Sequence, residues 1–160
     1  MNQSESKINK AQIGQCGVLL LQYKLLRRCI ESAPMTTDSG VDLVAYSPSN
    51  GNAITIQVKT NLKPKPGGGR GKPALDWRLP KDSPAKYVAL IDLDTQDTWL
   101  MSKEEMDQFA QQANGENYHF YMYMDSEVKT RNGKASHRGE SDRFLLEQRI
   151  VDVFGPSQSR

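Results

Sequence analysis

The sequence predicts an α/β protein in which helices flank a mixed central β-sheet. An amphipathic helical pattern opens the chain at residues 8–33. Two short strand patterns follow at residues 41–46 and 53–60, and residues 86–93 form a near-continuous apolar run that is typical of a strand covered on both faces. Further helical patterns follow these strands. This order of elements is typical of a mixed sheet with helices packed on it.

The composition is that of an ordinary globular chain. The 160 residues are 37% hydrophobic and 25% charged, so we expect one domain over residues 1–160, with residues 1–6 frayed. The longest apolar run, residues 18–21, is far shorter than the roughly 20 residues of a membrane span, and residues 1–10 lack the apolar core of a signal peptide. We therefore expect a cytoplasmic protein without a membrane partner.

The net charge of +2 is too small to indicate nucleic-acid binding by itself, so local clusters of charge have to carry that argument. Cys16 and Cys29 fall about 20 Å apart on the predicted first helix. That separation is too large for a disulfide, so we expect two buried free thiols and a reducing compartment.

The first half of the chain predicts a helix followed by a hairpin. Pro34 should end the helix of residues 8–33, because proline lacks the backbone N–H that a helix interior needs. Asn50 and Gly51 tolerate the positive φ of a tight turn between the two strands.

Residues 61–76 are rich in glycine and proline and have no periodic apolar residues, which predicts a flexible loop. Four basic residues in it are candidates for nucleic-acid binding: Lys63, Lys65, Arg70 and Lys72. Because the loop begins directly after the second strand, its charges can contact phosphates near that strand. A solvated connector would have the same composition, so both interpretations stay open.

The next stretch predicts strands and one helix. A short strand at residues 77–79 precedes the strand of residues 86–93, whose hairpin partner is expected at 98–101. A capping box at residues 102–105 should start a helix that runs to about residue 113.

The last part of the chain predicts a strand, a loop and a helix within residues 118–155. We interpret the aromatic and methionine side chains of the strand, residues 118–124, as packing rather than as a cofactor site. Residues 129–138 are polar and basic and predict an exposed loop. Ser141 should cap a final helix that ends at Gly155 and Pro156. Its apolar positions suit one face: Leu145, Leu146, Ile150, Val153 and Phe154.

Three polar residues of the hairpin are the candidate catalytic residues: Asp42, Gln57 and Lys59. Alternation puts Gln57 and Lys59 on one side of their strand, roughly 6 to 7 Å apart, and Asp42 can approach them across the hairpin. The apolar residues that alternate with Gln57 and Lys59 along the strand point to its opposite face: Ile54, Ile56 and Val58.

These side chains could form a magnesium site. Magnesium prefers oxygen ligands, of which proteins commonly supply one or two carboxylates while waters and a substrate phosphate complete the set. Asp42 could supply the carboxylate and Gln57 a neutral side-chain oxygen, with the backbone carbonyl of Val58 or Ile56 as a third ligand. Lys59 would orient or activate the attacking water during phosphodiester cleavage. The same pattern also fits a surface carboxylate and a solvated lysine.

The succession of a leading helix, G-V-D-L-V-A-Y, a turn and I-Q-V-K-T resembles the core of the PD-(D/E)xK nuclease superfamily. The likeness is greatest to its Holliday-junction-resolvase-like and Mrr-like members, some of which carry Gln-x-Lys in place of Glu-x-Lys. The downstream D-W-R-L, K-Y-V-A-L-I-D-L and T-W-L-M-S resemble uncharacterised bacterial and phage members. The resemblance covers about residues 11–112.

This resemblance implies a restriction-endonuclease-like core and a DNA endonuclease that depends on Mg²⁺ or Mn²⁺. It implies Asp42 and Gln57 as metal ligands and Lys59 as the catalytic lysine. Asp42 is preferred to Asp38 because of its place inside G-V-D-L.

The first helix departs from that family. Active members often carry a glutamate there, just after a glycine, that helps to hold the metal or its water. The corresponding positions are all neutral here: Gly14-Gln15, Gly17-Val18 and Gln22. Glu31 lies too close to Asp42 in sequence to replace that glutamate comfortably. A site with one carboxylate should bind magnesium weakly unless a DNA phosphate completes it.

Three functions are compatible with the sequence. The first is a magnesium-dependent DNA endonuclease or resolvase-like phosphodiester hydrolase. The second, suggested by the missing acid, is a nuclease-fold module that binds nucleic acid or a protein without catalysis. The third is a homo-oligomeric accessory or immunity-type protein, such as a homodimer, with an interface on residues 118–124 or on the final helix.

Overall fold

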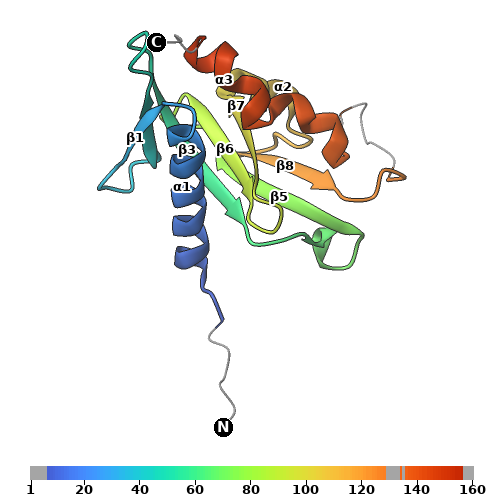
Figure 1. Cartoon of the computed structure of the whole chain (residues 1–160). Coiled ribbons are helices and arrows are strands. Elements are labelled where there is room, and N and C mark those ends of the chain that lie inside the picture. The colour runs from blue at the N-terminus through green and yellow to red at the C-terminus, as the bar shows by residue number, and fades with distance from the viewer. Residues whose placement is uncertain (1–6, 129–133, 135, 157–160) are drawn as a thin grey trace.

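The computed structural model describes residues 7–128, 134 and 136–156 (Figure 1). The helices and strands are α1 (Lys10–Leu26), β1 (Glu31–Pro34), β2 (Leu43–Tyr46), β3 (Ala53–Asn61), β4 (Lys65–Pro66), β5 (Pro73–Pro80), β6 (Tyr87–Asp92), β7 (Asp97–Ser102), α2 (Lys103–Phe109), β8 (Asn117–Tyr123) and α3 (Leu146–Phe154), with 3₁₀ turns η1 (Gly67–Gly69) and η2 (Arg138–Phe144). They form a five-stranded sheet in the order β1-β2-β3-β6-β7 and a three-stranded sheet in the order β4-β5-β8. The predicted α/β class with a mixed central sheet is confirmed.

Strand β6 belongs to two apolar cores at once. It pairs in parallel with β3 and antiparallel with β7. Its residues Ala89 and Ile91 pack in a first core with α1 and α3, whereas Val88 and Leu90 pack in a second core with α2, β5 and β8. The prediction of a strand covered on both faces is therefore confirmed.

The first helix is shorter than predicted. It ends at Leu26, a turn follows in which Cys29 has a φ of 59°, and residues 31–34 pair with β2 as the edge strand β1. Ile30 continues the helical spacing, but it enters the first core from the turn with 3% of its surface exposed. Pro34 therefore ends a strand rather than a helix, which an edge position tolerates.

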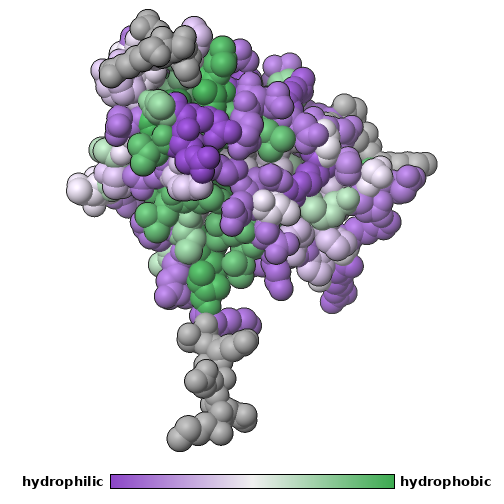
Figure 2. All heavy atoms as spheres, viewed as in Figure 1, coloured by the Kyte–Doolittle hydropathy of each residue, from purple (hydrophilic) through white to green (hydrophobic). Residues whose placement is uncertain are grey.

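The outward face of α1 carries an exposed apolar stripe. Leu19, Tyr23 and Leu26 are 55%, 57% and 61% exposed, and Figure 2 shows hydrophobic surface along this helix. Cys16 and Cys29 are free, as predicted, but both are exposed, so the prediction of buried thiols was wrong. Among the described residues, no helix combines the length and the hydrophobicity that crossing a membrane requires.

The predicted hairpin is confirmed. Strands β2 and β3 pair antiparallel, from Leu43 opposite Ile56 to Tyr46 opposite Ala53. Residues 47–52 connect them in a longer loop than the tight turn that was predicted, although Gly51 does take a positive φ of 76°.

Residues 61–76 contain more regular structure than predicted. Strand β4, turn η1 and the first part of β5 lie within them. The predicted short strand of residues 77–79 is the end of β5, which pairs with β8 along its length. Glycine and proline concealed the period-two spacing of Leu75, Trp77 and Leu79, all of which are buried in the second core.

The last two helices confirm some predicted boundaries and correct others. Ser102 and Glu105 form the predicted capping box of α2, but this helix ends at Phe109, because Ala110 has an extended ψ of 132°. Ser141 does not cap a helix, since it is buried within η2, and α3 begins only at Leu146. Gly155 ends α3 with a φ of 83°, as predicted.

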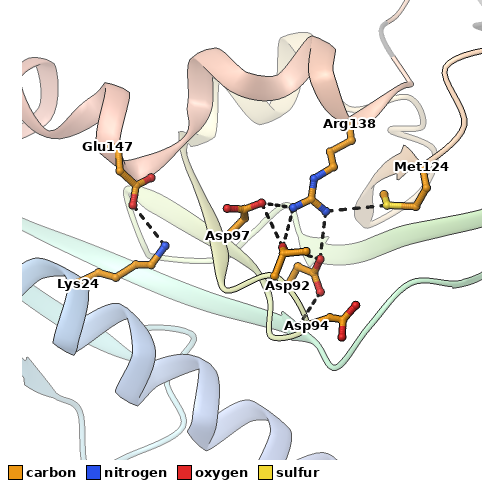
Figure 3. Close-up of polar contacts among 8 residues, drawn as sticks. Lys24, Asp92, Asp94, Asp97, Met124, Arg138 and Glu147 are labelled. Carbon is orange, nitrogen blue, oxygen red and sulfur yellow. Dashed lines mark hydrogen bonds and ion pairs between the residues drawn. The ribbon is translucent and has the colours of Figure 1, made fainter.

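Arg138 does not lie in an exposed loop, as was predicted, but holds η2 against the β6–β7 turn (Figure 3). Its Nη1 lies 3.1 Å from Oδ2 of Asp92, which is fully buried, and its Nη2 forms an ion pair with Asp97. The guanidinium also stacks over Trp99, 4.9 Å from the ring centroid. These contacts compensate the buried charge of Asp92. Ser136 of the predicted loop is also buried, and residues 129–133 and 135 lie outside the described residues.

Helix α1 approaches β3 more closely than a side chain allows. A Cβ on Gly17 would overlap Oγ1 of Thr60 and lie 3.0 Å from its Cβ. A Cβ on Gly14, one turn earlier in the same helix, would meet no atom within 4 Å.

We predict that Gly17→Ala lowers the free energy of unfolding by about 1 to 3 kcal/mol, because overpacking forces the helix away from the sheet. Gly14→Ala is the matched control and should raise it by roughly 0.5 to 1 kcal/mol through helix propensity. Urea denaturation measures both. A Gly17→Ala protein as stable as wild type would contradict the close contact.

Candidate active site

Asp42 is fixed beside β3 by two hydrogen bonds. Its backbone N–H donates to the carbonyl of Ile56 over 3.0 Å, and its carboxylate Oδ2 accepts the N–H of Val58 over 2.6 Å. Because Val58 lies between Gln57 and Lys59, the carboxylate stands next to the Gln-x-Lys segment. The structure therefore brings the predicted acid to the predicted strand.

The carbonyl of Val58 points to the same side of β3 as this carboxylate. The N–H and C=O of one strand residue point to the same side, and the Val58 N–H points to Asp42. The β2–β3 ladder ends at Leu43 opposite Ile56, so β2 stops short of this position. Of the two carbonyls considered from the sequence, that of Ile56 already accepts the Asp42 N–H, which favours Val58 as an open ligand.

Gln57 presents a buried acceptor without a partner. Its side chain is 8% exposed, and its Oε1 has no hydrogen-bond partner among the described residues. A buried acceptor left unsatisfied costs roughly 1 to 3 kcal/mol. With the Asp42 carboxylate and the Val58 carbonyl, this oxygen belongs to a candidate set of hard oxygen donors of the kind that Mg²⁺ prefers.

Lys59 lies on the same face of β3 as Gln57, one strand repeat further on. In the parallel register with β6, Lys59 lies opposite Leu90 and Gln57 lies opposite Val88. Lys59 is half-buried, and within the described part of the chain its ammonium makes no hydrogen bond or ion pair. It is thus available to bind a phosphate or a water molecule.

The site is low in negative charge. Helix α1 contains no acidic residue, as its sequence KAQIGQCGVLLLQYKLL shows. Within the residues that the structure describes, no group of three or more His, Cys, Asp or Glu side chains could hold a metal ion. The donors near β3 are thus a carboxylate, an amide oxygen and a carbonyl.

The four basic candidates are all exposed on the segment after β3. Lys72 forms an ion pair with Asp125, and this contact lowers the pKa of the Asp125 carboxyl. Lys63, Lys65 and Arg70 make no ion pair within the described residues. Three of the four charges are therefore free to meet a phosphate backbone.

Sequence interpretation missed the outward side of β8. Tyr118, Phe120 and Met122 pack in the second core, as expected for structural residues. The alternate side chains face the other way and line a hollow: His119, Tyr121 and Tyr123. Period-two alternation within residues 118–124 was the signal that could have separated the two sets.

Comparisons with known proteins concern the fold. No protein-family model and no curated protein matches the sequence. The structure is similar to that of a bacterial homing endonuclease, I-Ssp6803I, with a TM-score of 0.56 and 13% identity over 91% of this chain and 92% of that chain. It also matches the Holliday junction resolvase Hjc of Archaeoglobus fulgidus, with a TM-score of 0.46 and 16% identity over 66% of this chain and 81% of that chain.

The likeness to the homing endonuclease shows that the chain has a nuclease-like fold. The aligned share is larger than residues 11–112 alone could supply, so the match extends into the last part of the chain. Membership of an Mrr-like, Gln-x-Lys group stays a prediction.

We predict that Gln57→Glu increases Mn²⁺ affinity by about ten-fold or more, because ligand charge strengthens the binding of hard cations. Without metal, the second buried carboxylate beside Asp42 should lower the melting temperature, and Mn²⁺ should restore it. Electron paramagnetic resonance of free Mn²⁺ and thermal melting measure the two effects.

Gln57→Leu is the matched control for that substitution. It keeps an apolar body of similar size at position 57 and removes the oxygen, so Mn²⁺ binding should fall below that of wild type. Equal Mn²⁺ affinity in all three proteins would mean that Gln57 does not face a metal site.

Proposed function

We propose that this protein is a metal-dependent DNA endonuclease, a resolvase-like phosphodiester hydrolase. The observation that supports it most is the bond between the Asp42 carboxylate and the Val58 N–H, which brings this acid to the strand segment that contains Gln57 and Lys59. Among the described residues, the Gln57 side-chain oxygen has no hydrogen-bond partner. The nuclease-like fold, shared with a homing endonuclease, supports the same class of reaction.

In this proposal the residues of β2 and β3 hold the reacting groups. Bound Mg²⁺ or Mn²⁺ would supply Lewis-acid polarisation of the phosphate and a more acidic water. Asp42, Gln57 and the Val58 carbonyl would hold the ion. Lys59 would orient the attacking water and offset charge that develops on the phosphate oxygens. The short bond from Val58 keeps the Asp42 carboxylate in place before substrate arrives.

DNA is the proposed substrate. The segment after β3 carries exposed basic side chains, and phosphate contacts by lysine and arginine position a nucleic acid without reading its sequence. Because the segment starts two residues after Lys59, a backbone bound along it would pass the candidate site.

We predict that Lys59→Met reduces cleavage of plasmid or four-way-junction DNA in Mg²⁺ or Mn²⁺ by at least about 100-fold, as when one group that stabilises transition-state charge is removed. Lys86→Met is the control, since Lys86 is an exposed lysine beside the start of β6. Cleavage that survives Lys59→Met unchanged, or its absence from the wild type, would contradict the proposal.

Arg70→Ala should weaken duplex binding and lower the slope of log affinity against log salt by about one, the value for one phosphate contact. Lys72→Ala should change the slope less, because Asp125 already neutralises that ammonium. Fluorescence anisotropy of labelled duplex DNA at several salt concentrations measures both slopes. Equal slopes for Arg70→Ala and the wild type would exclude Arg70 from the interface.

A nuclease-fold module that binds without catalysis is the second candidate. The absence of acidic residues from α1 favours it, because a site with one carboxylate holds a divalent ion weakly. Metal-independent, salt-sensitive DNA binding without cleavage would distinguish this function from the first.

A homodimer and a single domain stay predictions. Alternate side chains of β8 and most apolar side chains of α3 are buried in the chain's own cores, although Val151 of α3 is 59% exposed. The exposed stripe of Leu19, Tyr23 and Leu26 on α1 is a further surface on which a second copy would pack. Strand β6, which contributes to both cores, supports one domain.

A further inference from the structure

A hollow of about 430 Å³ lies on the outer face of the β4-β5-β8 sheet. This volume falls within the roughly 300 to 1,000 Å³ of small-ligand pockets. Side chains of β8 and β5 line it together with the glycines of η1. No residue of the candidate active site belongs to its lining, so the hollow needs an explanation of its own.

One wall of the hollow is a row of rings on β8. His119, Tyr121 and Tyr123 project from alternate positions. The His119 and Tyr121 rings lie 5.3 Å apart, and those of Tyr121 and Tyr123 lie 5.7 Å apart, both in edge-to-face contact. Each ring supports the next, which restricts the rotamers of the whole row.

The backbone that carries the rings is also fixed. The side-chain amide of Gln111 donates to the Tyr121 carbonyl and accepts its N–H, over 2.8 and 2.9 Å. Gln112 forms a backbone bridge with His119, and the Tyr123 N–H donates to the carbonyl of Ser136. The free edge of β8 is closed, so the row is preorganised for a ligand rather than shaped by it.

The opposite wall carries little side-chain bulk. Gly67 packs against the Tyr123 ring, which a Cβ at that position would approach to 3.1 Å. Gly68 has a φ of 61°, and a Cβ there would meet no atom within 4 Å. On β5, Ala74 is the cross-strand neighbour of Tyr123 and adds only a methyl group to the wall. The small side chains of this wall therefore leave room for a flat group in the hollow.

A second hollow adjoins this pocket and reaches the end of β3 at Asn61. It shares Gly68, Ala74 and Asp76 with the first and extends to Asn61 and Lys65. Asn61 is on the same face of β3 as Lys59, two residues on, and its side chain donates to the Asp76 carbonyl over 2.6 Å. A chain molecule that leaves Lys59 along the basic segment would reach the rings through this passage.

We propose that the ring pocket binds an unpaired nucleobase, so that the preferred substrate is DNA with a single-stranded or extruded nucleotide beside the cleaved phosphate. Stacking on aromatic side chains is how proteins hold bases of single strands, and every base has a face that can stack. This inference rests on the proposed function for its choice of nucleic acid as ligand.

The charges distinguish a base from a phosphate as the occupant. Asp76 lines the pocket with its side chain 58% exposed, and its Oδ2 lies 3.7 Å from Nε2 of His119. A carboxylate repels phosphate but accepts hydrogen bonds from base N–H groups. The basic side chains stand outside on the segment after β3, where a sugar-phosphate backbone would run while its base enters the pocket.

The test is binding of an oligodeoxynucleotide that carries 2-aminopurine, as a single strand and as a full duplex, in EDTA so that no cleavage occurs. Wild type should quench the fluorescence of the single strand through stacking. Tyr121→Leu and Tyr123→Leu should each weaken single-strand binding by roughly ten-fold, the loss expected for one base stack, and leave duplex binding unchanged.

Two variants serve as controls. Tyr121→Phe keeps the ring and should retain the affinity and the quenching of wild type. Tyr46→Leu removes an exposed tyrosine of β2, in the other sheet, and should change neither DNA form. Thermal melting checks that each variant is folded, and Tyr123→Leu provides the answer if Tyr121→Leu fails to fold.

Equal losses on single strand and duplex, or no loss in either leucine variant, would overturn the pocket assignment. The outcome is separable from that of the proposed function. If single-strand binding depends on the rings but the protein never cleaves DNA, the pocket assignment is supported and the proposed nuclease function is rejected. If Lys59→Met abolishes cleavage but the ring substitutions do not change single-strand binding, the nuclease function is supported and the pocket assignment is rejected.

Discussion

Burial of β6 on both faces is the constraint on which the molecule depends. A strand with one buried face can be displaced at moderate cost, but Val88 and Leu90 serve one core while Ala89 and Ile91 serve the other. A shift of β6 by one residue would exchange every side chain between the cores. Its register is therefore firmly set, and because β3 pairs with it, the direction of Gln57 and Lys59 is set as well.

The candidate site arises where one strand stops and its neighbour continues. Strand β2 begins at Leu43, and beyond this point the side chain of Asp42 takes the place of a backbone partner for Val58. The small number of charged side chains in this site has a consequence for its affinity for metal and DNA. A divalent ion and a DNA phosphate that meet there would each raise the affinity for the other by the same factor, because coupling between two ligands is reciprocal.

Local patterns predicted the elements whose partners are near in sequence. The β2–β3 and β6–β7 hairpins and the capping box at Ser102 depend on neighbours within a few residues, and all three are present. The end of α1 was misplaced because Ile30 fits the helical period yet fills the core from a turn. Arg138 was misplaced because its partner Asp92 lies 46 residues earlier in the chain.

In the candidate site, too, local patterns predicted some features, whereas others depend on contacts between distant parts of the chain. The sequence could place Gln57 and Lys59 on one face by alternation alone, but the bond from Val58 to Asp42 depends on where β2 starts. The ring pocket could not be predicted, because its walls come from η1, β5 and β8, and their meeting is a property of the second sheet.

Strand β1 has a consequence for the behaviour of the chain at high concentration. It forms one edge of the five-stranded sheet with four residues, the charged Glu31 at one end and Pro34, which has no N–H to donate, at the other. A short edge of this kind is a poor template for a further strand. At the opposite edge, Trp99 of β7 is bridged by Leu145. Addition of a further strand is thus disfavoured at the β1 edge, and at the β7 edge it would have to displace the bridge from Leu145.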